Sequence, residues 1–382
     1  MPTPSQKQKH ILLVNAVLTN NGDVAITLAL YQRLVKEGFQ VKIATHHLDK
    51  IKAHYPELPL IADVGSEFIL RKLPILKRLF KPLIFSRKQE FKEADAVVAV
   101  PGGFMNSYYD FPQLVAFFKR CNAKLKTVGV YANSFGPFSE KDQQLLKDSE
   151  SNFSVLMARD ERSVNELEEI GISTDTYFKG NDAAFLLDQL SSRPTPKTAA
   201  ISVREWKNDA RDMAHYSKLI AAVTRKLVAE GYEVEFLSTC QGIEGYVNDA
   251  TTAQNIMSEH LSDLKNAVCV NSEYYTLSQL REKLAGYDLV VGTRLHMCLL
   301  ALKSGTPALN ISYEFKGKEA YNYLGLSQYS VDFNGPLEEA ANAVTLLISN
   351  KEQVREKLLK LMEEQKQLAE AGFEEFKRRL AL

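Results

Sequence analysis

The stretch DLVVGTRLHMCLLALKSGTPALNIS, residues 288–312, contains a complete strand–helix–strand pattern. One apolar run ends at Gly292, an apolar helical pattern resumes after His296, and a second strand-like run over 307–312 follows a Gly-Thr-Pro turn. Short apolar runs bounded by turn residues are typical of buried strands, and two parallel strands need a crossover of this kind. The stretch therefore predicts a parallel β-α-β unit whose helix is buried along one side.

The same alternation of strands and helices extends over most of the chain. A helical pattern over 23–38 follows the first expected strand, and the last segment, 337–382, has the pattern of a charged helix throughout. Strands that alternate with helices indicate parallel sheets. The expected strands cover residues 10–17, 40–45, 94–100, 125–132, 154–159, 199–203, 233–239, 266–271, 288–292 and 307–312.

A segment rich in Ser, Pro and Thr over 187–200 interrupts this alternation. We therefore predict an α/β fold with two Rossmann-like domains that face a central cleft. The N-terminal α/β domain is expected over 1–190, the C-terminal α/β domain over 197–350 and a C-terminal helix over 351–382. Ligands of such sheets bind outside the carboxyl ends of the strands, so polar residues that directly follow strands are the candidate site residues.

Composition excludes several classes of function. The 382 residues carry 47 Lys and Arg against 47 Asp and Glu, so no overall charge favours nucleic acid. The four cysteines lie far apart without the spacing of a zinc site, so we expect no metal and buried thiols in a reducing compartment. The polar N-terminus lacks a signal-peptide pattern and no apolar stretch reaches about 18 residues, so a cytoplasmic location is expected.

The start of the helix within 288–312 carries unusual residues for its position. Thr293 is expected to be the N-cap, which places Arg294, Leu295 and His296 in the first helical turn. A helix N-terminus favours anions, and a cation there costs about a few tenths of a kcal/mol. An anionic ligand would remove this conflict, with Arg294 and Arg204, which follows the strand at 199–203, both forking onto it. His296 would lie beside the anion with its pKa raised toward protonation, the alternative being a purely structural histidine.

Other polar residues follow strands elsewhere in the chain. Three polar loops that contain glycine, at 18–27, 100–110 and 131–138, are expected to line the cleft, although turns and helix caps alone would also explain them. Asp23 is expected to cap a helix that begins at Val24. Of two further cations, Arg159 either pairs with Asp160 or faces the cleft, and Lys316 is in reach of the cleft that Arg204 and Arg294 share.

Five motifs, in this order along most of the chain, resemble those of the polysaccharide pyruvyl transferases. They are NNGDVAI, PGGF, ARDERS, ISVRE and GTRLHMCLLALKSGTPALNISYEFK. The resemblance implies a fold similar to that of the two-domain GT-B glycosyltransferases. It also implies transfer of the enolpyruvyl group of phosphoenolpyruvate onto sugar hydroxyls, with formation of a pyruvate ketal and release of phosphate.

Roles for individual residues follow from the same resemblance. Arg204, Arg294, Leu295 and His296 would contact phosphoenolpyruvate, with His296 as general acid and with Arg159 and Lys316 as supporting cations. The sequence SYEFKGK departs from the commoner Ser-Tyr-Asp-Pro-Lys of the family, so both Lys316 and Lys318 remain candidates for the functional lysine.

The acceptor implied by the resemblance is a polysaccharide or a lipid-linked glycan precursor, and no cofactor is expected besides the donor substrate. Tyr108, Tyr109 and Phe135 could stack on sugar faces. Two alternatives remain: a GT-B glycosyltransferase or sugar epimerase that uses a nucleotide sugar, and a sugar-binding relative without activity. The expected acceptor-binding residues are Asp23, Asn106, Tyr108 and Asn133.

A basic segment over 68–89 carries seven Lys and Arg and no acidic residue. Apolar residues alternate with the basic ones at near-helical spacing, although Pro74 and Pro82 prevent one continuous helix. Such a segment could lie on an anionic membrane surface, which suits an enzyme whose acceptor is lipid-linked. The alternative is a solvated pair of helices that packs on the N-terminal sheet.

Overall fold

The computed structural model describes residues 8–63, 87–124, 126–206, 212–240 and 247–382. The basic segment predicted to contact membranes, 68–89, lies outside these residues except for its last three positions. The chain divides into two compact units. Unit 1 comprises residues 1–18, 26–186 and 366–382, and unit 2 comprises 19–25 and 187–365.

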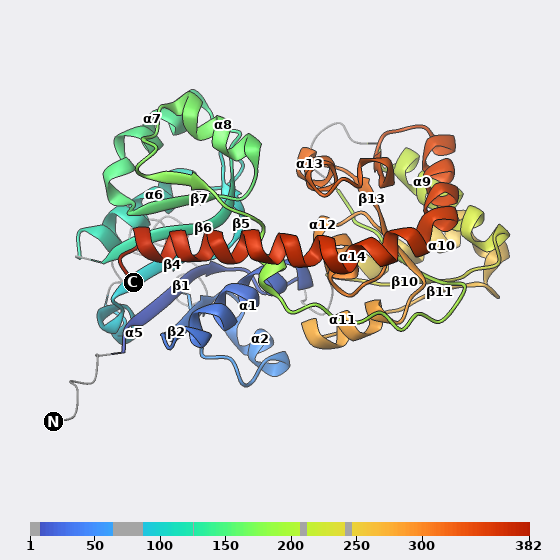
Figure 1. The fold of residues 1–382 in the computed structure, drawn as a ribbon, viewed down its shortest axis with the longest axis horizontal. Helices are drawn as coiled ribbons and strands as arrows, with labels where there is room; N and C mark the ends of the chain where they lie inside the picture. The colour runs from blue at the N-terminus through green and yellow to red at the C-terminus, as the bar shows by residue number, and fades with distance from the viewer. Residues whose placement is uncertain (1–7, 64–86, 125, 207–211, 241–246) are drawn as a thin grey trace. The chain divides into compact units, whose positions relative to one another are not determined.

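Unit 1 is built on a parallel sheet in the order β3-β2-β1-β4-β6-β7-β8, and β5 pairs with β6 outside this path. Helices α6, α7 and α8 pack in a row (Figure 1). The strands are β1 (His10–Ala16), β2 (Gln40–Thr45), β3 (Leu60–Ala62), β4 (Ala96–Ala99), β5 (Gly102–Met105), β6 (Thr127–Phe135), β7 (Val155–Ala158) and β8 (Tyr177–Lys179). The helices are α1 (Asn21–Lys36), α2 (Leu48–His54), α5 (Gln89–Glu93), α6 (Phe111–Asn122), α7 (Glu140–Asp148) and α8 (Glu161–Ile170).

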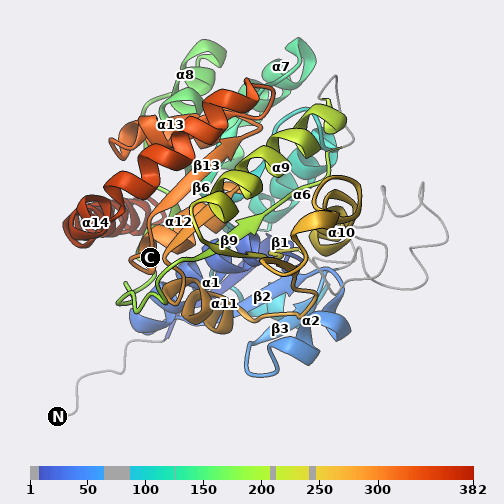
Figure 2. The ribbon, with the colours of Figure 1, turned by 90° about the vertical axis from the view of Figure 1, so that its right-hand side faces the viewer.

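Unit 2 contains a second parallel sheet, in the order β11-β10-β9-β12-β13-β14. Helix α9 packs beside α10, and α11 packs beside α12 (Figure 2). The strands are β9 (Thr198–Ser202), β10 (Glu233–Phe236), β11 (Val268–Val270), β12 (Leu289–Gly292), β13 (Ala308–Ser312) and β14 (Ser330–Asp332). The helices are α9 (Met213–Ala229), α10 (Asp249–His260), α11 (Leu277–Ala285), α12 (Leu295–Lys303), α13 (Phe315–Tyr323) and α14 (Leu337–Arg379).

The register of the unit 2 sheet brings two predicted site segments to one edge. Gly292, the last residue of β12, pairs with Ser202, the last residue of β9. Because both strands end at the same level, Arg204 and the residues that follow Gly292 leave the sheet side by side. The predicted α/β fold with parallel sheets is confirmed, and the β12-α12-β13 unit is the one that the stretch 288–312 indicated.

The last helix, α14, differs from the domain boundaries predicted at 350 and 351. It begins at Leu337 and continues without a break through both positions, and its residues from Lys366 onward belong to unit 1. Phe376 packs edge-on against Tyr131 of β6, with ring centroids 4.9 Å apart. Gly129 makes room for this contact, because a Cβ atom there would lie 2.7 Å from the Phe376 ring. An apolar stripe on the helix thus ties the end of the chain to the N-terminal sheet.

A second boundary correction concerns the segment 19–25, which was predicted to belong to the N-terminal domain. It belongs to unit 2, because Asn21 donates its backbone N–H to the Thr239 carbonyl at 2.8 Å and its side-chain amide to the Tyr275 carbonyl at 3.0 Å. The start of the NNGDVAI motif therefore belongs to the unit that holds α12.

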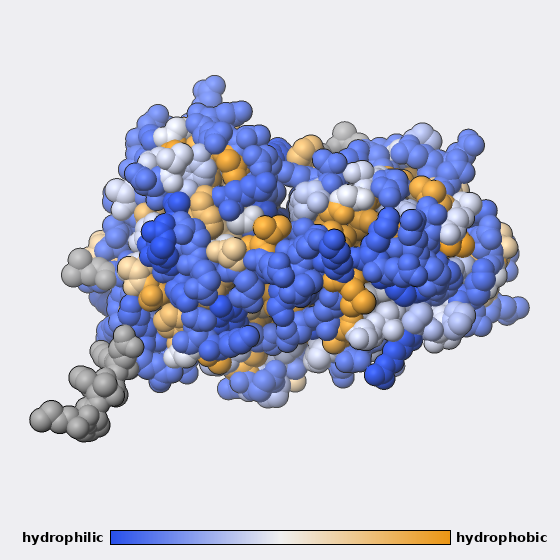
Figure 3. Space-filling view, viewed as in Figure 1, coloured by the Kyte–Doolittle hydropathy of each residue, from blue (hydrophilic) through white to orange (hydrophobic). Residues whose placement is uncertain are grey.

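Hydrophilic side chains predominate on the face of the molecule shown in Figure 3, and apolar side chains form small, scattered spots. Within the described ranges, no helix has both the length and the apolar composition needed to cross a membrane.

Candidate active site

The helix α12 begins differently from its prediction. Its N-cap is Arg294, in extended backbone conformation and without a side-chain cap, and the first helical residue is Leu295. Thr293, the predicted cap, instead uses its side-chain hydroxyl in a 2.7 Å hydrogen bond with the hydroxyl of Tyr216. Tyr216 is buried, so its hydroxyl needs a partner inside the protein. The helix therefore starts with backbone N–H groups that no side chain of the N-cap residue satisfies, which is the arrangement that favours an anion.

Arg294 forks onto a carboxylate of the protein itself. Its Nε and Nη2 donate to Oδ2 and Oδ1 of fully buried Asp249, both at 2.8 Å. Burial lowers the pKa of Arg294, but the charge and hydrogen bonds of Asp249 outweigh this effect and raise it, so the guanidinium remains cationic. The predicted fork onto a ligand is thus directed at Asp249, and a ligand could meet only the Nη1 side of the guanidinium.

Arg204 is held by aromatic rings rather than by a carboxylate. Its guanidinium carbon lies 4.6 Å from the ring centroid of Trp206 and 4.4 Å from that of Tyr313, and it donates a hydrogen bond to the Tyr313 hydroxyl. Rings on a guanidinium fix its plane without neutralising its charge. Arg204 thus keeps its positive charge available at the edge of the sheet.

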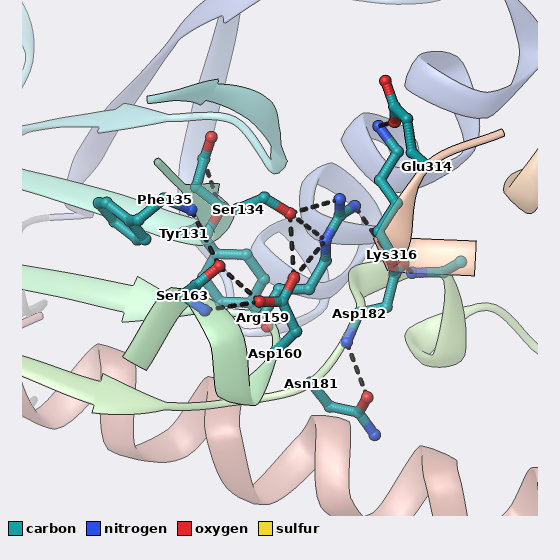
Figure 4. Close-up of polar contacts among 12 residues, drawn as sticks. Tyr131, Ser134, Phe135, Arg159, Asp160, Ser163, Asn181, Asp182, Glu314 and Lys316 are labelled. Carbon is teal, nitrogen blue, oxygen red and sulfur yellow. Dashed lines mark hydrogen bonds and ion pairs between the residues drawn. The ribbon is translucent and has the colours of Figure 1, made fainter. Parts of the chain in front are cut away.

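A small pocket opens beside the start of α12. Lys316 lines it and forms an ion pair with Glu314 (Figure 4), whereas Lys318 pairs with Asp332 at 2.5 Å and lies outside the lining. Of the two candidate lysines, Lys316 is therefore the one at the pocket. The lining residues are Thr293, Leu295, Asn310, Ser312, Tyr313, Glu314, Lys316 and Gly317.

The start of α1 lies directly against His296. A Cβ atom at Gly22 would stand 3.0 Å from Cβ and 3.2 Å from Nδ1 of His296. The predicted N-cap, Asp23, is the third residue of α1. The backbone N–H of Asp23 donates a 2.9 Å hydrogen bond to the side-chain oxygen of Asn20. The helix begins earlier than predicted because Asn20 is the residue in N-cap geometry.

The thiol of Cys240 is buried, and the Cys240 carbonyl accepts the backbone N–H of Asp249 at 2.9 Å. Burial raises the pKa of this thiol to about 12. Cys240 itself is protonated at neutral pH and is not a nucleophile.

Arg159 lies in unit 1, in a network of its own. The buried guanidinium donates to Ser134 Oγ at 2.6 Å, and it lies 3.2 Å from Asp182 and 3.7 Å from Asp160 (Figure 4). Asp160 also caps α8 by accepting a hydrogen bond from the backbone N–H of Ser163. The pairing with Asp160 that the sequence indicated as one environment of Arg159 is present, and Asp182 joins it.

The predicted acceptor residues of unit 1 have unequal access to solvent. Asn133 is fully buried and donates to the Val100 carbonyl, so it cannot reach a sugar from this position. Phe135 is likewise buried in the core and cannot stack on a sugar. Tyr108 is 81% exposed, and Asn106 shapes its loop by accepting a hydrogen bond from the Tyr108 backbone N–H at 2.9 Å. The burial of Asn133 was not predicted because the strand was expected to end at residue 132, whereas β6 continues to Phe135 and includes Asn133.

Sequence reasoning also missed the partners of the two arginines. Nothing in the sequence around Asp249 indicates a contact with Arg294, 45 residues away. A signal did exist for Gly22, since glycine in the first turn of a helix is unfavourable unless another group approaches closely. Among the residues that the structure describes, no group of three or more His, Cys, Asp or Glu side chains is placed to hold a metal ion.

Residues 20–314 match the family described as Polysaccharide pyruvyl transferase. The chain is 28% identical over 299 residues to the amylovoran biosynthesis protein AmsJ of Erwinia amylovora, a match that covers 72% of this chain and 71% of AmsJ.

Solved structures resemble the fold at low sequence identity. A putative UDP-N-acetylglucosamine 2-epimerase of Listeria monocytogenes superimposes with a TM-score of 0.60 at 12% identity, over 92% of this chain and 90% of the epimerase. The spinosyn rhamnosyltransferase SpnG gives a TM-score of 0.58 at 13% identity, over 97% of this chain and all of SpnG. These likenesses confirm the predicted GT-B-like architecture.

Proposed function

Because the chain belongs to the polysaccharide pyruvyl transferase family, we propose that it moves the enolpyruvyl group of phosphoenolpyruvate onto hydroxyls of a polysaccharide or lipid-linked glycan precursor. The products would be a pyruvate ketal and phosphate. The observation that carries the proposal is that four cationic or titratable residues adjoin the start of α12 in unit 2. Lys316 lines the pocket there, Arg204 packs on the lining residue Tyr313, and Arg294 and His296 flank the lining residue Leu295. The likeness to AmsJ supports a role in the synthesis of an exopolysaccharide.

The chemistry of the donor suits this site. Phosphoenolpyruvate carries a carboxylate and a phosphate, and the site offers two guanidinium groups, one ammonium group and the first N–H groups of α12.

The proposed reaction begins with a proton from His296 to the methylene carbon of phosphoenolpyruvate. The carbon that bears the phosphate then becomes oxocarbenium-like, and a sugar hydroxyl adds to it and loses its proton. The C–O bond to phosphate breaks with its electron pair on phosphate, which regenerates an oxocarbenium-like carbon. A second sugar hydroxyl adds to this carbon and loses its proton to give the ketal. General acid catalysis of this kind contributes about 10²–10⁴-fold to a rate.

For the acceptor, exposed aromatic rings are the best-placed groups in unit 1. Tyr108 and Tyr109 are 81% and 63% exposed, and each could stack on a sugar ring. In unit 2, Asp23 follows Gly22, which lies against His296, so Asp23 could accept a proton or a hydrogen bond from an acceptor hydroxyl. We place the reaction on the cytoplasmic side of the cell membrane, where segment 68–89 would hold the enzyme near a lipid-linked acceptor.

The proposal is tested by incubating the purified chain with phosphoenolpyruvate and a panel of lipid-linked and model glycosides. Phosphate release that depends on one of the glycosides, together with a ketal in the product, is the expected result. A parallel series with nucleotide sugars serves as the control. Turnover of a nucleotide sugar without any use of phosphoenolpyruvate would instead identify a glycosyltransferase or epimerase.

A further inference from the structure

We propose that Asp249 is a positioning residue for the donor: it holds the guanidinium of Arg294 in the one orientation in which its remaining edge meets phosphoenolpyruvate. This inference rests on the proposed function. Neither the sequence motifs nor the comparisons assign a role to Asp249, which lies at the start of α10.

The geometry of the pair fixes the guanidinium plane. Both oxygens of Asp249 are engaged, with Oδ2 on Nε and Oδ1 on Nη2 of Arg294, each at 2.8 Å. Two parallel hydrogen bonds leave a guanidinium no freedom to rotate about its Nε–Cζ axis relative to the carboxylate. The Arg294 side chain is 14% exposed and Asp249 is fully buried, so the exposed part of the pair belongs to the arginine.

Asp249 is itself anchored by the loop that follows β10. Its backbone N–H donates to the Cys240 carbonyl at 2.9 Å, and Thr239 Oγ1 donates to Oδ2 at 3.4 Å. The carbonyl of Thr239 also accepts the backbone N–H of Asn21, the neighbour of Gly22. One loop therefore fixes both the carboxylate that orients Arg294 and the helix start that lies against His296.

The position of Arg294 explains why a carboxylate is needed there. As the N-cap residue of α12, Arg294 places a cation where the helix dipole disfavours one. A buried carboxylate on the inner side compensates this charge and keeps the guanidinium from swinging into solvent. The Arg294 side chain keeps 14% of its surface exposed next to Leu295, which lines the pocket, so its remaining edge is on the pocket side of the pair.

The test uses calorimetry to measure the dissociation constant of phosphoenolpyruvate for the full, unsubstituted chain and for its Asp249→Asn variant. An asparagine keeps the shape but presents N–H groups to the guanidinium, so the fork breaks and we expect the dissociation constant to rise at least tenfold. In an Arg294→Lys background, which has already lost the fork, Asp249→Asn should change the dissociation constant less than threefold.

A matched control is Asp288→Asn. Asp288 is also a buried carboxylate of unit 2, but it pairs with Lys351 and Arg355 rather than with Arg294. Its variant should lower the melting temperature without changing the dissociation constant for phosphoenolpyruvate. If Asp249→Asn does not fold, the test uses Asp249→Glu, which keeps the charge but displaces it. This variant should also raise the dissociation constant for phosphoenolpyruvate.

The outcomes separate the inference from the function beneath it. If the unchanged chain does not bind phosphoenolpyruvate, the proposed function fails and this inference fails with it. If the chain binds phosphoenolpyruvate and the Asp249 variants bind it equally well, only the inference is overturned. Equal weakening by Asp288→Asn would also overturn it, because the effect would then reflect general loss of stability.

Discussion

Substituting Gly22 by alanine should impair catalysis while leaving stability almost unchanged. The new Cβ atom would stand 3.0 Å from Cβ and 3.2 Å from Nδ1 of His296, with Asn20 Oδ1 at 3.1 Å on its other side. Carbon atoms pack best at about 3.5–4.0 Å, so the imidazole has to withdraw by roughly 0.5 Å. A catalytic group misplaced by about 1 Å can cost about 10²-fold in rate. A displacement of about 0.5 Å should therefore lower kcat by about tenfold, which corresponds to an activation free energy higher by about 1.4 kcal/mol.

Stability follows a different balance in this variant. Alanine in place of a helical glycine gains up to about 1 kcal/mol of helix propensity, which offsets the crowding against His296. Measurement of kcat, the KM for phosphoenolpyruvate and the melting temperature separates the two effects, with Gly286→Ala as control. Gly286 also belongs to unit 2, and a Cβ there would meet only the Lys283 carbonyl, at 3.3 Å. An unchanged kcat for Gly22→Ala, or an equal loss of kcat in the control, would refute the reasoning.

Three further predictions follow from the site and its surroundings. His296→Ala should lower kcat by about 10²–10⁴-fold with the fold intact by circular dichroism, and turnover within a few-fold of the parent would assign the proton to another group. Replacing Tyr108 and Tyr109 by alanine should raise the KM for the glycan but not for phosphoenolpyruvate, whereas an unchanged glycan KM would remove them from the acceptor site. Burial raises the pKa of Asp288, but Lys351 and Arg355 outweigh this effect and lower it, so its stabilising contribution is fully present well above the unfolded-state pKa of about 3.9 and is lost as the pH falls below that value through the lower folded-state pKa. Thermal unfolding should accordingly show that Asp288→Asn costs about 2–3 kcal/mol at pH 7 and progressively less as the pH falls below about 3.9, and a cost independent of pH would contradict this.

Much of the fold was predictable because buried parallel strands are continuous apolar runs. β2 was placed at its observed bounds, 40–45, and the strands of the stretch 288–312 were placed within one residue of theirs. Strands β3, β8 and β14 were not predicted, since each has only three residues and a run that short carries little periodicity. The position of the end of α14 in unit 1 was not predictable either, because a helical pattern does not say against which sheet its apolar stripe packs.

The candidate site was predictable only in its residue types. Arg204 and His296 were found because polar residues after buried strands stand out from their surroundings. The contact between Gly22 and His296 joins positions 274 residues apart, and the fork between Asp249 and Arg294 joins positions far apart as well. Such contacts depend on the sheet order and on the loop after β10, which local patterns do not encode.

The most direct test of the central claim is to run the reaction in D₂O with phosphoenolpyruvate and an accepted glycan, and to record the product by NMR. Protonation of the methylene carbon at the His296 site predicts a ketal methyl group that carries one solvent deuterium, with one phosphate released for each ketal formed. A product without a ketal methyl group, or phosphate release that leaves the glycan unchanged, would contradict the proposal that this chain is a pyruvyl transferase using phosphoenolpyruvate.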